Sequence, residues 1–322
     1  MSDPRPQSPR RQSGDVSDTT YRAPPSILFP FCRAHGRIDL TFPPGKSLHM
    51  NIQNYESLNW AYQLHYYICF RSHRRKALFT SSMLLERLSA RLLEICQKHG
   101  YHLFESKWCS KQVRLVVSLR PDQAISRVIQ TLKTNLASVC GLESPVWARG
   151  FLAKSTGRVN RETVRHYLMA QTAHHRYADR LLPPVFRYRN QDRRPLRSAH
   201  AFFDLSHHVV LATQFRRAVF DAATARELGS YWLGVAEKRG FAIDQMSILP
   251  DHGHLLMRIV PQASVESCVL ALMNNGQYFM AKHFPEILVR AGMDRLWESS
   301  AYAGTCGEFT TALMRTFLRN GW

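Results

Sequence analysis

The segment LVVSLRP at residues 115–121 returns in altered form as LLMRIVP at residues 255–261, 140 positions further along the chain. Each version is an apolar run that ends in proline, which is typical of a strand followed by a turn. The segments KHGY at 98–101 and KRGF at 238–241 keep the same offset of 140. Two matches in one order at one offset indicate an internal duplication.

Further matches lie on both sides of these segments. Upstream, HYYICFRSHRR at 65–75 resembles HHVVLATQFRR at 207–217 at an offset of 142. Downstream, a tryptophan and a glycine recur at an offset of 150, so an insertion of ten residues falls around 283–292. The upstream match puts an arginine pair at equivalent places in both copies, and these pairs are Arg74 with Arg75 and Arg216 with Arg217.

Both copies predict the same order of elements. An apolar β-rich run comes first, at 62–70 and 207–213, and a helix with apolar residues at helical spacing follows it. Two strands, a second helix after the proline, a short strand and a last helix complete each copy. The paired strands are expected at 101–107 and 113–119, or 241–248 and 254–260, and the last helices at 161–171 and 309–319. The order β-α-β-β-α-β-α predicts an α+β, ferredoxin-like fold, with helices on one side of an antiparallel sheet.

The duplication divides the chain into four parts. The segment before the first copy is predicted to be a disordered or irregular arm, because its first 26 residues are rich in Ser, Pro, Arg and Asp without periodicity. The parts are the arm at 1–58, the first copy at 59–171, a basic linker at 172–200 and the second copy at 201–322.

The linker combines seven arginines with three aromatic residues, Tyr177, Phe186 and Tyr188. Two interpretations fit this composition equally well. One is a solvated connector. The other is a segment that follows a nucleic-acid backbone and stacks on bases.

Composition limits the class of protein. The chain has 43 Lys and Arg against 24 Asp and Glu, a net charge of +19, which favours a polyanion such as nucleic acid as partner. No apolar run approaches the about 20 residues of a membrane span, and the N-terminal residues are not those of a secretory signal. Seven cysteines without a Cys-x-x-Cys pair indicate reduced thiols. We therefore expect a cytoplasmic protein with no membrane partner.

Two features carry potential chemistry. His252 and His254 are two residues apart on a predicted strand, which sends both imidazoles to one face, where they can share a metal. Two histidines on a half-exposed strand are the plainer alternative. Tyr167 and Gln171 are four apart in a predicted helix and lie on one face of it, where a tyrosine at the edge of the core is the alternative.

Taken together, these residues resemble the single-tyrosine HUH transposases of bacterial insertion sequences, the group that includes the REP-associated tyrosine transposases. The resemblance covers residues 60–171 and 201–322. Its markers are PDHGHLL at 250–256 and VRHYLMAQ at 164–171, together with LW at 296–297 and GTCG at 304–307. The chain departs from the family at Gly253, where a bulky apolar residue is usual.

The resemblance implies that neither copy is complete. The first copy has Gln112 and Arg114 where the histidine pair belongs, and the second has Phe317 and Gly321 where the tyrosine and glutamine belong. Members of the family act as dimers, in which the histidines and the tyrosine helix of one site come from different subunits. A monomer acting as a pseudo-dimer would therefore join His252 and His254 to Tyr167 and Gln171 in one composite site.

The family's chemistry gives roles to these residues. Tyr167 would be the nucleophile that forms a 5′-phosphotyrosine link. His252, His254 and Gln171 would hold one divalent metal, Mg²⁺ or Mn²⁺. The expected substrate is single-stranded DNA with a hairpin, or imperfect palindrome, which implies association with the nucleoid. The arginines Arg74, Arg75, Arg216 and Arg217 are expected to contact phosphates, with solvated loop charges as the alternative. The predicted function is that of a DNA nuclease or transposase, and the alternative is an inactive binder of DNA or RNA hairpins.

Overall fold

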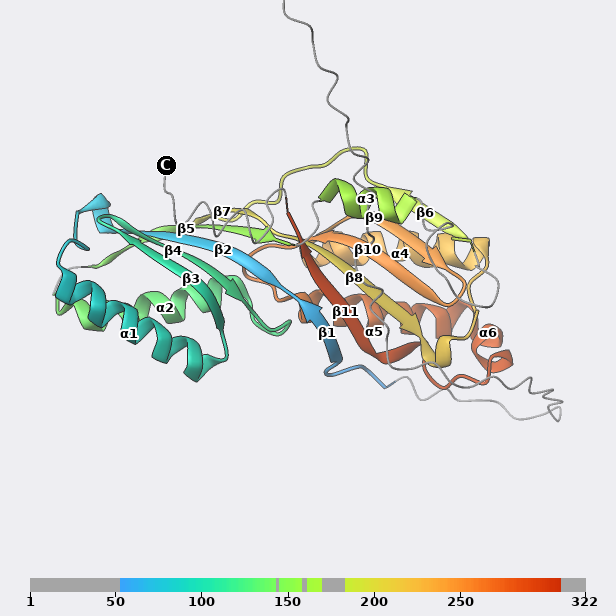
Figure 1. The fold of residues 1–322 in the computed structure, drawn as a ribbon. Helices are drawn as coiled ribbons and strands as arrows, with labels where there is room; N and C mark the ends of the chain where they lie inside the picture. The colour runs from blue at the N-terminus through green and yellow to red at the C-terminus, as the bar shows by residue number, and fades with distance from the viewer. Residues whose placement is uncertain (1–52, 143–144, 158–160, 170–182, 308–322) are drawn as a thin grey trace, which may run out of the picture. The chain divides into compact units, whose positions relative to one another are not determined.

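A computed structural model describes residues 53–142, 145–157, 161–169 and 183–307, with the backbone alone described for 167–169 (Figure 1). No helix in these ranges is long and apolar enough to cross a membrane. Residues 53–58 form neither helix nor strand, but Tyr55, within the predicted arm, is buried. Its hydroxyl lies 2.7 Å from the carbonyl oxygen of Trp297. This hydrogen bond ties the end of the predicted arm to the second copy.

The first copy has the expected order of elements. Its strands form an antiparallel sheet in the order β3-β4-β2-β5, and α1 and α2 pack against the core side of that sheet. Helix α1 stops at Gly100, whose left-handed backbone (φ 67°) glycine adopts readily. The elements are β2 (His65–Ser72), α1 (Ser82–His99), β3 (His102–Cys109), β4 (Gln112–Ser118), α2 (Ile125–Cys140) and β5 (Trp147–Thr156).

The second copy repeats this fold. Its four strands form an antiparallel sheet in the order β11-β8-β10-β9, and α4 and α5 pack on one side of it. The predicted insertion contains a short helix, α6 (Pro285–Arg290). The other elements are β8 (Ser206–Thr213), α4 (Ala222–Arg239), β9 (Ala242–Leu249), β10 (His252–Arg258), α5 (Val265–His283) and β11 (Trp297–Cys306). The ferredoxin-like fold is thus confirmed for both copies.

Each sheet gains an edge strand from the other copy. Strand β1 (Asn59–Gln63), which precedes the first copy, pairs parallel with β11 of the second. Strand β7 (Ala201–Asp204), which precedes the second copy, pairs parallel with β5 of the first. The two sheets therefore have the strand orders β1-β11-β8-β10-β9-β6 and β3-β4-β2-β5-β7. We call them the six-stranded and the five-stranded sheet.

Part of the predicted linker is also a strand. Strand β6 (Phe186–Arg189) pairs antiparallel with β9 at the edge of the six-stranded sheet. Its aromatic residues are half-buried against the core and its arginines are exposed, the alternation of a strand with one buried face. The rings of Phe186 and Tyr188 therefore pack against the protein core, while Tyr177 lies outside the described residues.

The sheets also correct the alignment of the two copies by one residue. His65 is opposite Ser118 on β4, and Ser206 is opposite Arg258 on β10, so the first strands correspond at an offset of 141 instead of 142. The short turns after these strands support the same offset of 141. Residues with positive φ are Arg74 and Arg75 in the first copy and Phe215 and Arg216 in the second. Arg75 is therefore equivalent to Arg216.

Reciprocal hydrogen bonds join the copies. The Ser155 hydroxyl donates to the carbonyl oxygen of Cys306, and the Thr305 hydroxyl donates to that of Thr156, both at 2.5 Å. Two backbone bonds repeat the same symmetry, each at 2.9 Å, from Ser126 N to Pro261 O and from Glu266 N to Pro121 O. Paired contacts of this kind characterise two equivalent surfaces related by a two-fold axis.

Gly307 tests this junction. A Cβ atom there would lie 2.2 Å from the carbonyl oxygen of Ser155, which is backbone and cannot rotate away. We expect Gly307→Ala to lower the free energy of unfolding by about 2 kcal/mol. Gly234→Ala is the matched control, because it adds the same methyl group to exposed helix with no atom within 4 Å. Chemical denaturation measures both, and equal stability of the two variants would contradict the close contact.

Candidate active site

Strand β10 presents alternate residues to the two sides of the six-stranded sheet. Leu255 and Met257 point into the core beneath α4 and α5, so His252 and His254 lie on the opposite face. Both histidines are nearly buried, with 7% and 4% of their surface exposed, and their ring centroids are 5.0 Å apart. The structure thus brings the predicted pair together on one face. We call this surface the histidine face.

A third histidine belongs to the histidine face. His208 on β8 is opposite Leu256, and its Nε2 lies 3.1 Å from Nδ1 of His254. Burial lowers the pKa of His208 to about 4, so its imidazole is neutral at pH 7. This contact could not be predicted from the sequence, because it depends on the register between β8 and β10.

Asp251 orients the first histidine of the pair. Its carboxylate lies 2.5 Å from Nδ1 of His252 and 2.9 Å from the guanidinium of Arg216. Burial by itself would raise the pKa of Asp251, but the hydrogen bond from His252 and the positive charge of Arg216 act against burial, and the pKa is lowered. An ionised Asp251 favours a proton on Nδ1 of His252 and directs the lone pair to Nε2.

The two imidazoles fit the requirements of a metal site in part. Asp251 and His208 engage the Nδ1 atoms of His252 and His254, the outer hydrogen bonds that orient metal-binding histidines. No three His, Cys, Asp or Glu side chains form a metal-binding group among the described residues. A divalent metal on this pair therefore requires at least one ligand beyond the His, Cys, Asp and Glu side chains of the described residues. The predicted one, Gln171, lies outside the described residues.

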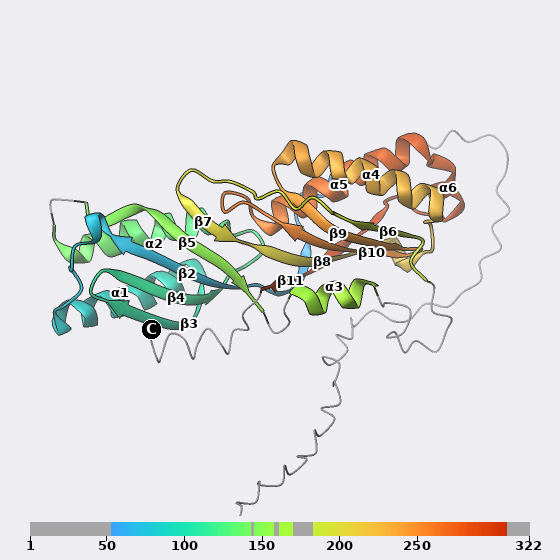
Figure 2. The ribbon, with the colours of Figure 1, turned by 90° about the horizontal axis from the view of Figure 1, so that it is seen from above.

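Helix α3 (Arg161–Met169) ends the first copy but packs on β9 and β10 of the second. Figure 2 shows α4 and α5 on one side of the six-stranded sheet and α3 on the other. The expectation that helices pack on one side of the sheet holds for α1 and α2 in the first copy and for α4 and α5 in the second. The last helix of the first copy instead covers the histidine face of the second.

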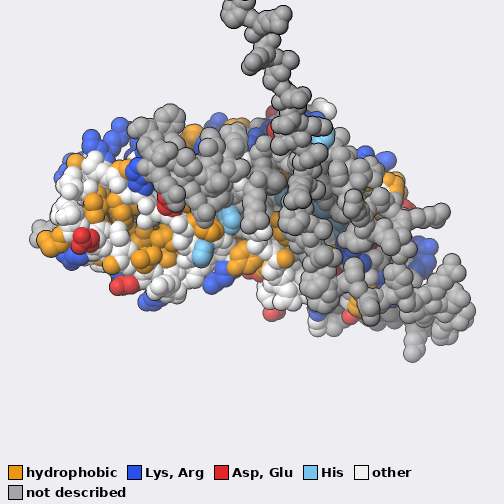
Figure 3. Space-filling view, in the orientation of Figure 1, with side chains coloured by type: hydrophobic (Ala, Val, Ile, Leu, Met, Phe, Trp, Pro, Cys, Tyr) orange, Lys and Arg blue, Asp and Glu red, His pale blue; other side chains and the backbone are white. Residues whose placement is uncertain are grey.

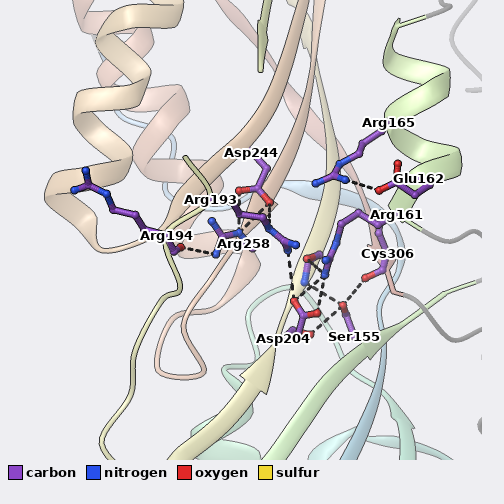
Figure 4. Close-up of polar contacts among 11 residues, drawn as sticks. Ser155, Arg161, Glu162, Arg165, Arg193, Arg194, Asp204, Asp244, Arg258 and Cys306 are labelled. Carbon is purple, nitrogen blue, oxygen red and sulfur yellow. Dashed lines mark hydrogen bonds and ion pairs between the residues drawn. The ribbon is translucent and has the colours of Figure 1, made fainter. Parts of the chain in front are cut away.

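A buried ion pair fixes the start of α3. The Arg161 guanidinium, with a side chain 7% exposed, donates to both carboxylate oxygens of Asp204 at 2.7 and 2.8 Å and to the Ser206 hydroxyl at 2.9 Å (Figure 4). Asp204 and Ser206 stand at the junction of β7 and β8. The sequence did not single out Arg161, whose partners come from the other copy.

From this anchor, α3 runs along β10 toward the histidines. Arg161 is bonded to Ser206, which is opposite Arg258, and Val164 packs on Leu256 and Cys306 in a small buried cluster. One helical turn and two strand residues cover similar distances, about 5.4 and 6.6 Å. The next turn of α3 contains the backbone of Tyr167, and the next residue of β10 on this face is His254.

The predicted phosphate-binding arginines divide into two groups. Arg74 and Arg75 are exposed in the turn after β2. Arg216 is bonded to Asp251, and Arg217 donates to the carbonyl oxygen of Ala291. In the second copy, therefore, Arg216 contacts the residue that orients His252, and Arg217 contacts the end of α6.

Comparison with known proteins agrees with the fold. The family model described as "Transposase IS200 like" matches residues 60–171 and again residues 201–321. The ISDra2 transposase TnpA of Deinococcus radiodurans is 25% identical over 118 residues, which are 37% of this chain and 84% of that protein. The transposase of insertion sequence IS200 from Salmonella typhimurium is 25% identical over 122 residues, 38% of this chain and 80% of that protein.

Among solved structures, a REP-associated tyrosine transposase bound to a REP hairpin is 14% identical, with a TM-score of 0.27. The match covers 34% of this chain and 64% of that one. The family model, by contrast, covers most of the sequence in two successive matches. The chain therefore belongs to the IS200-like transposase family and carries two copies of the family's domain.

Proposed function

We propose that this transposase-like protein is a metal-dependent, HUH-type nuclease and strand transferase for single-stranded DNA, with one composite site. The observation that carries the proposal is the packing of α3, from the copy that has Tyr167, on β10, from the copy that has His252 and His254. Each copy lacks what the other supplies, since Gln112 and Arg114 replace the histidines and Phe317 replaces the tyrosine.

In the proposed site, His252, His254 and Gln171 hold Mg²⁺ or Mn²⁺. When bound, the metal polarises a phosphate oxygen and orients the scissile bond. Imidazole nitrogens beside an amide oxygen favour Mn²⁺ somewhat over Mg²⁺. Asp251 keeps the His252 ring in place, and His208 does the same for His254.

Tyr167 supplies the nucleophile in this proposal. A phenol has a pKa near 10, so its proton must leave as the oxygen attacks phosphorus. The new bond joins the Tyr167 oxygen to the 5′-phosphate, and the O3′–P bond breaks and leaves a free 3′-OH. Attack by a different 3′-OH reverses the link and joins two strands without ATP. One nucleophile and one histidine pair allow one such link per chain.

The proposed substrate is single-stranded DNA next to a hairpin, which would place the protein at the nucleoid. The exposed Arg74 and Arg75 are suited to phosphate contacts, and the net charge of +19 favours binding to DNA in general. One chain would act alone, because the reciprocal contacts between its copies already form a two-fold arrangement.

A covalent-adduct assay tests this function. Hairpin oligonucleotides from the DNA that flanks the gene, labelled and single-stranded, are incubated with the protein and Mn²⁺. We expect one labelled band that survives denaturing electrophoresis and maps to Tyr167, and we expect a chelator to prevent it. Hairpin binding without an adduct in either Mn²⁺ or Mg²⁺ would refute the enzyme and favour the inactive hairpin binder.

A further inference from the structure

The last strand of the six-stranded sheet has no counterpart in the first copy. Strand β6 comes from the predicted basic linker and pairs with β9, whereas β3, the strand equivalent to β9, ends the five-stranded sheet. Among the described residues, no strand pairs with the outer edge of β3. The linker therefore adds a strand only to the sheet that carries the histidine pair.

The registers place two arginines of β6 on the histidine face. Arg187 is opposite Ser247 of β9, and Ser247 is opposite His254 of β10. Because directly paired residues point to the same side of a sheet, Arg187 shares that side with His254. Arg189 is two residues further along β6 and points the same way. We call Arg187 and Arg189 the β6 arginines. The two aromatic residues of the strand point the opposite way, into the core.

The β6 arginines lie at the rim of the proposed site. Two strand spacings separate β6 from β10, so the backbone of Arg187 is about 10 Å from that of His254. Helix α3, which contains the backbone of Tyr167, packs on β9 and β10, and β6 lies beyond them at the edge of the sheet. A short stretch of extended DNA strand spans this distance. The β6 arginines can therefore reach phosphates close to the one that Tyr167 would attack.

Both side chains are available to a ligand. Arg187 and Arg189 are exposed, and neither makes a hydrogen bond or an ion pair with any other described residue. Their Cα atoms are about 6.8 Å apart along the strand, which allows each guanidinium to contact a different phosphate. Figure 3 shows Lys and Arg side chains at the edge of the second copy, where β6 is the last strand of the sheet.

The acidic residues beside β6 already have other partners. Asp244 on β9 pairs with Arg258 at 2.8 Å and with Arg193 at 3.1 Å (Figure 4). Asp192, which follows β6, pairs with Arg194 at 2.8 Å. These carboxylates are therefore engaged by arginines outside the strand, and the β6 arginines keep their charge for an outside anion.

We infer that Arg187 and Arg189 bind the phosphate backbone of single-stranded DNA beside the composite site and so hold the strand in place for attack. A guanidinium offers paired N–H donors that match the oxygens of a phosphate. Of the two interpretations of the basic linker, contact with a nucleic-acid backbone is the one that β6 supports, through its arginines. This inference rests on the proposed function for the identity of the ligand as DNA.

Binding measurements with the full chain test the inference. The probe is a fluorescent single strand of about 30 thymidines, followed by anisotropy between about 50 and 200 mM salt. We expect Arg187→Gln with Arg189→Gln to raise the Kd about fivefold. The slope of log K against log salt should fall by about 1.4, which is about 0.7 for each lost phosphate contact. Arg187→Lys with Arg189→Lys keeps both charges and should keep the slope.

A matched double variant controls for general loss of charge. Arg226→Gln with Arg239→Gln removes two exposed arginines from α4, on the opposite side of the same sheet. It should leave the Kd within about twofold of the wild type. All these changes are at exposed positions, so the melting temperature should stay the same in every variant. A Kd and slope of the β6 variant equal to those of the α4 variant would overturn the inference.

Adduct formation gives an independent readout. With a hairpin substrate, the β6 variant should need more DNA for half-maximal adduct formation but reach the wild-type rate at saturation, because Tyr167 and both histidines are untouched. A lower rate at saturation with unchanged half-saturation would contradict a role in binding.

Substrates with one neutral methylphosphonate linkage locate the contact. At a position next to the scissile bond, the neutral linkage should weaken binding by the wild type and leave binding by the β6 variant unchanged. Equal weakening of both proteins at every position would refute the contact. If the wild type forms no adduct at all, the proposed function fails, while the anisotropy measurements still decide whether the β6 arginines bind phosphates.

Discussion

Tyr167→Phe is expected to eliminate the covalent DNA adduct while leaving hairpin binding close to that of the wild type. The variant loses only the attacking oxygen, and removal of a nucleophile typically reduces turnover by about 10³-fold or more. Helix α3 should stay in place, because the Val164 cluster anchors it about one turn earlier and the Arg161 ion pair about two turns earlier. Denaturing electrophoresis measures the adduct, and anisotropy with a labelled hairpin measures the binding.

Tyr302→Phe is the matched control for this prediction. Tyr302 lies on β11 opposite Val210, on the histidine face, and its ring meets that of His208 at 5.9 Å between centroids. Loss of its hydroxyl should leave the adduct in place. Adduct formation by Tyr167→Phe, combined with its loss in Tyr302→Phe, would transfer the nucleophile to Tyr302. Tyr177 would be the next candidate if both variants remain active.

Local sequence patterns were sufficient to predict the elements within each copy. Apolar residues at helical spacing predicted α1 and α4, and the prolines at 121 and 261 marked the turns before α2 and α5. These signals work because each copy buries its own sheet beneath its own helices, so the pattern along the chain reports local burial.

Local patterns could not predict how the two copies align residue by residue, or how neighbouring strands pair. The arginine pairs after β2 and β8 supported an offset of 142, whereas the sheets give 141. A shift of one residue moves every side chain of a strand to the other face. The contact between His208 and His254 escaped prediction because it depends on the register of β8 against β10, which the alignment of the two copies does not report.

Contacts between the copies were also beyond local patterns. Strands β1 and β7 are five and four residues long, and each is stabilised by a partner strand more than 40 residues away. The same holds for α3, whose sequence is amphipathic but does not specify which sheet it covers. The idea of a composite site came from the family resemblance, and the packing of α3 on β10 now supplies a physical basis for it.

The second large effect concerns the assembly of that site. Mixing the Tyr167→Phe chain with a His252→Ala, His254→Ala chain is expected to restore less than about 1% of wild-type adduct. Each variant lacks one half of the site, and a partner chain could supply it only by exchange. Exchange would have to break the β1–β11 and β5–β7 pairings and the reciprocal bonds of Ser155 and Thr305. A size tag on one chain shows which of the two is labelled.

A labelled histidine variant in this mixture would mean that the site forms between chains, because only that chain retains Tyr167.

A variant that adds a second tyrosine tests the same claim from the other side. Phe317→Tyr in the intact chain restores a tyrosine to the second copy, but the first copy, which would have to supply the metal ligands, has Gln112 and Arg114 in place of the histidines. Arg114 already carries a fixed positive charge and has no lone pair to give to a metal. The chain should therefore still accept one DNA strand covalently, and two adducts per chain would rule out a single composite site.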